Sequence, residues 1–285
     1  MKLMSKLFLM AAFFLLVGCS KKGEPNPLTQ APESTITVTD QRGKEVKINT
    51  PVEKLVAVPM PMASLIYTID GSSDRIGAMH PAAVGAVKNG ILGKIDPKFA
   101  SVSSSFIGND FVVNVEEALK IKPSVVLQWG DKGDGLTAPL ENAGIPVVGL
   151  KYGTQDDLKT WVNLVGKILG QEDRANNLLT WQDEKLREIQ NLTSNLNESD
   201  KPKVLYLYSP DTLRTTGSGT YNNEYLGWTG AFNLASGTKD FNDLTMEQII
   251  AWDPEIIYVG NFGKSAAKDI LSNSIPGQKW QSVKA

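Results

Sequence analysis

The fold is decided by the stretch NVEEALKIKPSVVLQW at residues 114–129, which returns in altered form as TMEQIIAWDPEIIYVG at residues 245–260. Each copy has a glutamate at its third position, an apolar pair near its middle, a proline at its tenth position and then a hydrophobic run. The first part has helical spacing, and proline ends the helix because it lacks the N–H that the next turn needs. The chain therefore contains one helix–proline–strand unit twice.

Short apolar runs alternate with helical stretches on both sides of these units, which is typical of βαβ units and a parallel sheet. A hairpin is predicted from residue 34 to about 48, and helices are predicted at 62–70, within 136–144, over 222–236 and in the two repeated units. Buried strands are predicted at 54–58, 75–79, 124–129, 145–150, 203–208 and 255–260. The chain thus indicates two α/β regions.

The stretch between the two α/β regions has a different pattern. Apolar residues recur at helical spacing from Leu158 to Leu169 and again from Ala175 to Leu196. The second helix spans about twenty residues, or roughly 30 Å at 1.5 Å per residue. It can act as a rigid connection between two lobes. The alternative is a core helix of one large domain, but the repeated unit argues against it.

Length and composition narrow the function classes. The chain has 285 residues, enough for two domains, with 41% hydrophobic and 21% charged residues, as in ordinary globular proteins. Its formal charge of −2 argues against a basic nucleic-acid surface. No stretch after the N-terminus is long and apolar enough to cross a membrane.

The N-terminus has the pattern of an export signal. Lys2 and Lys6 precede eleven apolar residues, 7–17, and then come Gly18 and Cys19, the only cysteine. LVGC resembles the bacterial lipobox, so Cys19 is the predicted lipidation site; the alternative is an ordinary signal peptide with an incidental cysteine. The polar, proline-rich residues after it predict a flexible tether.

The ordered set of motifs resembles one family: substrate-binding lipoproteins of ABC importers for iron–siderophore, haem and cobalamin, the helical-backbone metal receptors. The motifs that carry the resemblance are VTDQRGKEVKI, EKLVAV, NVEEALKIKPSVVLQW, LENAGIPVVGL, LGQEDRANNLL, KPKVLYLY, TMEQIIAWDPEIIYVG and IPGQKWQSVKA. The resemblance implies a class III periplasmic binding protein, with two Rossmann-like α/β lobes joined by one long helix and the ligand between them.

The domain boundaries follow from the motifs and the resemblance. In the family, the W..VKA segment is followed by a turn, a strand and closing helices, so a chain ending at Ala285 is expected to have an incomplete C-terminal lobe. The predicted parts are a signal peptide (1–18), a lipidated tether (19–34), an N-terminal lobe (35–154), a helical region (155–200) and a C-terminal lobe (201–285).

The resemblance also implies where the permease docks. In the family, one glutamate at the tip of each lobe meets arginines of the permease, and these positions correspond to Glu116 and Glu247. The alternative is a capping role, since both glutamates begin helices after Asn114 and Thr245, where a carboxylate is favourable. The two roles can coexist.

Candidate ligand contacts lie where predicted strands end, because open α/β sheets bind ligands at the carboxyl edge. Trp129 offers a flat wall or is a core residue, and Arg214 pairs with an anionic chelate or is only solvated. His80, the only histidine, is an axial ligand if the cargo is haem, or is structural. Further loop candidates are Met60, Met62, Met79, Tyr152, Tyr221, Asn261 and Phe262.

The predicted function is capture of a metal chelate outside the cytoplasmic membrane and delivery to an ABC permease and its ATPase. A ferric siderophore ranks first, then haem, then cobalamin or another metal complex. The protein is expected to be a lipid-anchored monomer without a cofactor or a direct metal site. The alternative from another class is an exported α/β enzyme, but the sequence offers no nucleophile–base pair for one. A third hypothesis is a surface-anchored adhesion or sensor protein.

Overall fold

The computed structural model describes residues 34–260 and 264–284. It opens with the predicted hairpin, β1 (Ser34–Thr39) and β2 (Glu45–Thr50), paired antiparallel. The turn between them is tied to the first sheet, because the Asp40 carboxylate accepts hydrogen bonds from the Arg42 side chain (2.7 Å) and from the Gly149 backbone N–H (2.8 Å). Arg42 also donates to Glu141 at 2.8 Å. The hairpin is thereby held as part of the folded body.

The first sheet is parallel throughout, in the order β4-β3-β5-β6. Every residue in three of its strands is buried, which is what continuous apolar runs predict for a sheet covered on both faces. Its strands are β3 (Leu55–Ala57), β4 (Ile76–Met79), β5 (Val125–Trp129) and β6 (Val147–Leu150).

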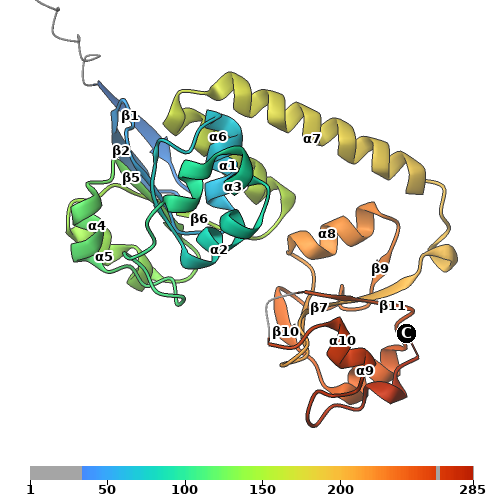
Figure 1. The fold of residues 1–285 in the computed structure, drawn as a ribbon. Helices are drawn as coiled ribbons and strands as arrows, with labels where there is room; N and C mark the ends of the chain where they lie inside the picture. Colours follow the sequence, from blue (N-terminus) through green and yellow to red (C-terminus); the bar gives the residue numbers. More distant parts are fainter. Residues whose placement is uncertain (1–33, 261–263, 285) are drawn as a thin grey trace, which may run out of the picture. The chain divides into compact units, whose positions relative to one another are not determined.

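Helices cover both faces of this sheet. Successive strand residues point to opposite faces, so Val125 and Leu127 join one core and Val126 joins the other. Figure 1 shows α1 and α6 on one face, and α4 and α5 on the other. The helices of this region are α1 (Met62–Asp70), α2 (Pro81–Asn89), α3 (Leu92–Ile95), η1 (Pro97–Ser101), α4 (Val115–Ile121), η2 (Asp134–Leu136) and α5 (Ala138–Asn142).

The repeated unit takes the same local form in both places. Asn114 caps α4 by accepting the Glu117 N–H at 3.1 Å, and Thr245 caps α9 (Met246–Trp252) by accepting the Gln248 N–H at 3.2 Å. Both helices end at a residue in the left-handed region, Lys122 with φ 54° and its counterpart Asp253 with φ 46°. A proline and then a strand follow each time, so the predicted repeat is confirmed.

Two helices follow the first sheet. α6 (Gln155–Leu169) begins with a capping box between Thr154 and Asp157 and ends at Gly170 in the left-handed conformation. α7 (Glu172–Thr193) has 22 residues and is about 33 Å long at 1.5 Å per residue. The two helices pack closely near their junction, where a Cβ on Gly166 would overlap Ala175. The predicted long helix is present and ends three residues earlier than its apolar pattern.

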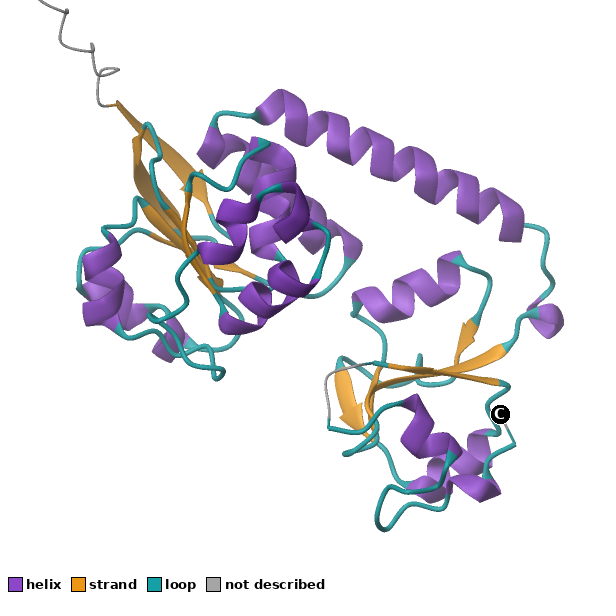
Figure 2. Cartoon of the chain, in the orientation of Figure 1, coloured by secondary structure: helices purple, strands orange, loops and turns teal. Residues whose placement is uncertain are grey.

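The second sheet has the order β10-β8-β7-β11, and β9 also pairs with β7. It is mixed, because β11 and β9 run parallel to β7, whereas β8 and β10 are antiparallel to their neighbours. Figure 2 shows its strands and the short helices around them. The elements are η3 (Glu198–Asp200), β7 (Lys203–Ser209), β8 (Arg214–Thr216), α8 (Tyr221–Trp228), β9 (Phe232–Asn233), β10 (Phe241–Asp243), β11 (Ile256–Val259), α10 (Ala267–Leu271) and η4 (Trp280–Ser282).

Two expectations for this region are corrected. The stretch 222–236 was expected to form one or two helices, but its only described helix ends at Trp228, and Gly230, with φ 76°, turns the chain into β9. Arg214 was expected on a loop, but it begins β8, which pairs back on β7. Both differences come from tertiary strand pairing that local periodicity does not encode.

The predicted mixed α/β class is confirmed by the two sheets and their helices. From Ser34 onward the backbone contacts group as one compact unit, so the lobe boundaries at 154 and 200 stay a prediction. The predicted signal peptide, Cys19 and nearly all of the tether lie outside the described residues. No described helix has the length and apolar character needed to span a membrane.

Candidate functional site

A row of aromatic rings in contact lies at the carboxyl edge of the first sheet. His80 stacks on Phe111 at 4.7 Å between ring centroids, and Phe111 meets Trp129 edge-on at 6.1 Å. Trp161 then contacts Trp129 at 5.7 Å and Tyr152 at 6.4 Å. Three sequence candidates, His80, Trp129 and Tyr152, are thus brought into one aromatic row, as their strand-end positions predict.

The sequence candidates near the first sheet differ in how far their side chains are buried. Met79, His80 and Trp129 are buried, with only 8% of Trp129 exposed, whereas Tyr152 is half-buried. Met62 is fully buried in the first turn of α1 and packs in the core, while Met60 just before it is half-buried. In this structure, Tyr152 and Met60 are therefore the more accessible first-sheet candidates.

His80 is held in a structural position. It caps α2, its Nδ1 accepting the Ala82 N–H at 3.1 Å. Burial lowers the pKa of His80, and the backbone of Asn109 opposes this only in part, so the ring is neutral at pH 7. A neutral imidazole that accepts at Nδ1 carries its hydrogen on Nε2, which leaves that nitrogen no lone pair for iron. The arrangement favours the hypothesis that His80 is structural over the hypothesis that it is an axial ligand of haem.

Arg214 stands at the edge of the second sheet with 46% of its side chain exposed. Its guanidinium lies 5.5 Å from the centroid of the Phe241 ring, and its ion pair with Asp243 is long, at 3.8 Å. Tyr208 packs edge-on against the same Phe241 ring at 5.0 Å. The cation is therefore positioned by an aromatic face, with most of its hydrogen-bonding capacity open to a ligand.

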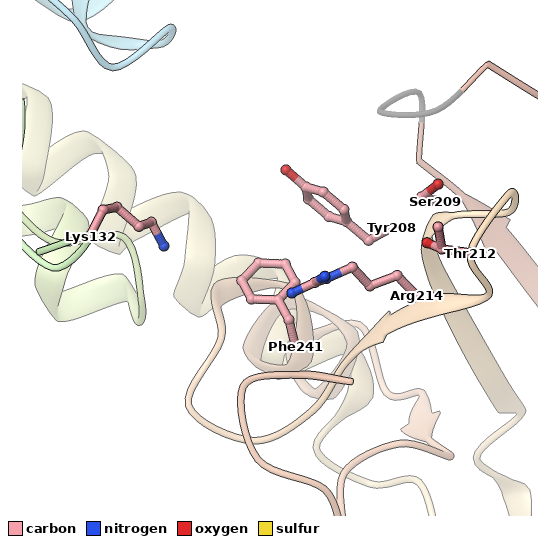
Figure 3. A pocket seen from close by; sticks show the side chains of 6 residues that line it. All are labelled: Lys132, Tyr208, Ser209, Thr212, Arg214 and Phe241. Atoms are coloured by element: carbon pink, nitrogen blue, oxygen red, sulfur yellow. The ribbon is translucent and has the colours of Figure 1, made fainter. Parts of the chain in front are cut away.

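Arg214 lines a cavity of about 390 Å³ together with five residues that are not among the candidates named from the sequence (Figure 3). The full lining is Lys132, Tyr208, Ser209, Thr212, Arg214 and Phe241. It combines two cations, three hydroxyl groups and two aromatic rings. Such a lining suits an anion with a flat apolar part, since the cations attract charge and the rings cover apolar surface.

Five tyrosines form a second group, the tyrosine cluster: Tyr152, Tyr206, Tyr208, Tyr221 and Tyr225. Burial raises the pKa of Tyr152 to about 12, helped by the neighbouring phenols of Tyr206 and Tyr208. Burial likewise raises the pKa of Tyr225 to about 12 and, by a smaller step, that of Tyr206, against hydrogen bonding with Asn222. At pH 7 these phenols are neutral.

Several members of this cluster were missed from the sequence: Tyr206, Tyr208 and Tyr225, and with them Lys132 and Phe241. A signal was available for the tyrosines. Tyr206 and Tyr208 are two apart on a strand and so share a face, and Tyr221 and Tyr225 are four apart on a helix. Lys132 and Phe241 had no comparable signal.

Glu116 and Glu247 are exposed, and neither forms a salt bridge with a described residue. Hydrogen bonds from its own backbone N–H and from the Thr245 side chain lower the pKa of Glu247, so it is charged at pH 7. The side-chain caps come from Asn114 and Thr245, and both glutamates keep exposed side chains in the first turn of their helices. The docking role stays a prediction.

The remaining candidates, Cys19, Asn261 and Phe262, lie outside the described residues. Within the described ranges, no three His, Cys, Asp or Glu side chains gather in a way that could hold a metal ion.

Comparison with known proteins agrees with this architecture. A family model described as periplasmic binding protein matches residues 82–285. The molybdate-binding protein MolA of Haemophilus influenzae is 22% identical over 273 residues, which cover 87% of this chain and 74% of MolA. The uncharacterised ABC transporter substrate-binding lipoprotein YvrC of Bacillus subtilis is 25% identical over 274 residues, which cover 91% of this chain and 81% of YvrC.

A solved structure points the same way. The crystal structure of a periplasmic solute binding protein from Veillonella parvula is 34% identical, with a TM-score of 0.72, and the match covers 88% of this chain and 76% of that one. The class III fold predicted from the sequence is confirmed by this likeness. Proteins of this kind are exported and pass small ligands to a permease. The family model covers well over half of the chain, which therefore belongs to the periplasmic binding protein family and is a substrate-binding protein of an ABC transporter, not an enzyme.

Proposed function

We propose that this substrate-binding protein captures an anionic metal chelate, with a ferric siderophore as the first choice, and that it works as a monomer anchored to the membrane through Cys19. The proposal rests on one observation, the cavity in which Arg214 and Lys132 stand beside the rings of Tyr208 and Phe241. Two cations beside aromatic rings match a ligand that is both charged and organic.

The lining separates the possible cargoes. An uncharged chelate would leave Arg214 with only its long ion pair to Asp243, so it makes less use of the cavity than an anion does. Haem held through an imidazole would need His80, which is buried, neutral and engaged as a helix cap. A bare oxyanion, of the kind named for the relative MolA, would use the cations and hydroxyls but not the rings.

Substitution of Arg214 tests the proposal. Hydrogen bonds to charged groups contribute about 1.5–3 kcal/mol, so Arg214→Ala should weaken binding of a ferric tris-catecholate by about 10- to 100-fold. Binding is measured by the quenching of intrinsic tryptophan fluorescence. Arg187→Ala, which removes an exposed arginine on α7, is the matched control and should leave affinity unchanged.

A neutral ferric hydroxamate serves as the second ligand of this experiment. If it binds as tightly as the anionic chelate, or if Arg214→Ala leaves both affinities unchanged, the anionic-chelate proposal is wrong. The assignment as a transporter's binding protein would still stand, because it rests on the family match.

A further inference from the structure

Two buried carboxamides border the tyrosine cluster with acceptor oxygens that lack a donor. Gln155 and Asn222 are each only 6% exposed. Gln155 Oε1 and Asn222 Oδ1 have no hydrogen-bond partner among the described residues. A buried polar group left unpaired costs about 1–3 kcal/mol, so two such oxygens beside one cluster call for an explanation.

Several of the surrounding polar groups are paired. Thr220 caps α8 by accepting the Asn223 N–H, and Asn233 donates to the Asn223 side chain at 2.9 Å. The backbone N–H of Gln155 donates to the Glu224 carboxylate at 2.6 Å. In the described chain, the buried Thr216 hydroxyl and His80 Nε2 also lack partners, but both of these groups can donate, whereas the amide oxygens of Gln155 and Asn222 can only accept.

Both amides belong to the same neighbourhood as the charged cavity. The Asn222 side chain contacts the phenols of Tyr206 and Tyr225. Tyr206 lies on the same face of β7 as Tyr208, which lines the cavity. The Glu224–Gln155 hydrogen bond holds the start of α6 against α8. Neither amide lines the cavity itself; Asn222 contacts the tyrosine cluster, one member of which, Tyr208, lines the cavity.

Charge in this neighbourhood is opposite to that of the cavity. Arg214 and Lys132 make the cavity cationic, whereas the Glu224 carboxylate accepts a hydrogen bond from the Gln155 backbone N–H and also raises the pKa of Tyr221 after the larger effect of burial. Acceptor oxygens and a carboxylate favour hydrogen-bond donors and oppose an anion. The site therefore has a cationic end and an acceptor-rich end.

We propose that Gln155 and Asn222 accept hydrogen bonds from N–H or O–H groups of the bound ligand, so that the cargo is an organic chelate carrying such donors at one end and negative charge at the other. A bare oxyanion such as molybdate offers no donor hydrogen and would be selected against. This inference rests on the proposed function and specifies the chemistry of its ligand.

The test uses two chelators that differ by one donor hydrogen. Ferric complexes of 3,4-dihydroxy-N-methylbenzamide and 3,4-dihydroxy-N,N-dimethylbenzamide have the same charge and the same rings, but only the first carries an amide N–H. A net hydrogen bond between neutral groups corresponds to about 3- to 10-fold in affinity, so the wild-type protein should prefer the N–H complex by about that factor.

Variants then locate the preference. Gln155→Leu and Asn222→Leu should each lower affinity for the N–H complex and reduce the ratio between the two complexes toward one. Gln190→Leu, on the exposed part of α7, is the matched control and should keep the wild-type ratio. A variant that merely disturbs packing would weaken both complexes equally, which would contradict the proposed role.

The outcomes separate this inference from the function on which it rests. Equal affinity of the wild-type protein for the two complexes, with binding still dependent on Arg214, would overturn the donor-accepting site and leave the anionic-chelate function intact. Binding of molybdate with neither ferric complex bound would overturn both.

Discussion

At the scale of single residues, His80 is held in place by both the helix that it caps and the ring on which it stacks. Its ring stacks on Phe111, and Phe111 has φ 64°, a conformation that bulky residues rarely adopt. The Gln128 side chain donates to the Phe111 carbonyl at 3.2 Å and helps to hold this conformation. We therefore interpret His80, Phe111 and Gln128 as the group that fixes the loop beside Trp129.

His80 should make stability depend on pH. Its pKa is lowered in the folded state, so between that value and the unfolded value of about 6.5 the unfolded chain binds more protons. The contribution of the neutral His80 ring to the free energy of unfolding is fully present above about pH 6.5. It is lost as the pH falls toward the pKa of His80 in the folded state. The urea midpoint should therefore fall between pH 7 and pH 5.

His80→Asn isolates this effect, because asparagine can still cap α2 but does not titrate. His80 is the only histidine, so the variant should show a flatter midpoint over the same pH range. An unchanged slope would mean that other groups cause the pH dependence.

Trp129, which ends β5, and Tyr152, which follows β6, were identified as candidates because periodicity predicts where those strands end. Lys132 and Phe241 were not, since Lys132 lies in an irregular loop and Phe241 lies on a three-residue strand placed only by its pairing with β8. Whether a buried atom such as Gln155 Oε1 has a hydrogen-bond partner depends on the positions of all its neighbours in the fold. No sequence pattern predicts this.

At the scale of elements, the duplicated helix–proline–strand unit is the part of the fold that sequence reasoning predicts best. Capping, helix termination and the following strand are all local, so the same residue pattern gives α4–β5 and α9–β11. β8, β9 and β10 have two or three residues each and exist only through pairing within the second sheet. Elements this short carry no periodic signal of their own.

The two repeated helices carry the docking prediction. Glu116→Arg or Glu247→Arg should impair uptake of the chelate by whole cells, because each replaces an exposed carboxylate with a charge that repels the arginines expected on the permease. Ligand affinity of the purified variants should stay within about twofold of wild type, since surface changes away from a site usually cost less than about 0.5 kcal/mol.

Glu255→Arg provides the control, being an exposed glutamate of the second region that lies outside the first turn of α9. It should leave uptake unchanged. Normal uptake by the Glu116→Arg, Glu247→Arg double variant would contradict docking and leave these glutamates with only a helix-terminal role.

At the scale of the whole molecule, two sheets with separate hydrophobic cores contribute residues to the candidate site. The core of the second sheet is built around Leu205, Leu207 and Ile249, apart from the cores around the first sheet. The first sheet supplies Lys132 and the aromatic row, and the second supplies Arg214 and most of the tyrosine cluster. Fold class and family were predictable because they depend on many weak motifs in a fixed order. The charge of the candidate site depends on which side chains come together in the folded chain. Of its two cations, only Arg214 was predicted.

The last prediction concerns how such a molecule is retained beside its permease. Lys2, Lys6, the apolar run at 7–17 and the LVGC sequence predict that Cys19 becomes a lipidated N-terminal residue. Each buried CH₂ adds only about 0.8 kcal/mol, so stable anchoring needs more than one acyl chain, as in diacylated or triacylated lipoproteins. Wild-type protein should fractionate with membranes and enter the detergent phase of a Triton X-114 partition.

Cys19→Ser should move the protein to the soluble fraction, because serine cannot form the thioether to the lipid. The purified variant should bind the ferric chelate with wild-type affinity, since the anchor precedes Ser34, the first described residue. Uptake at low chelate concentration should nevertheless fall, because anchoring keeps the binding protein concentrated near the permease. Wild-type protein found mainly in the soluble fraction would show that the lipobox interpretation is wrong and would leave the ligand site and the family assignment untouched.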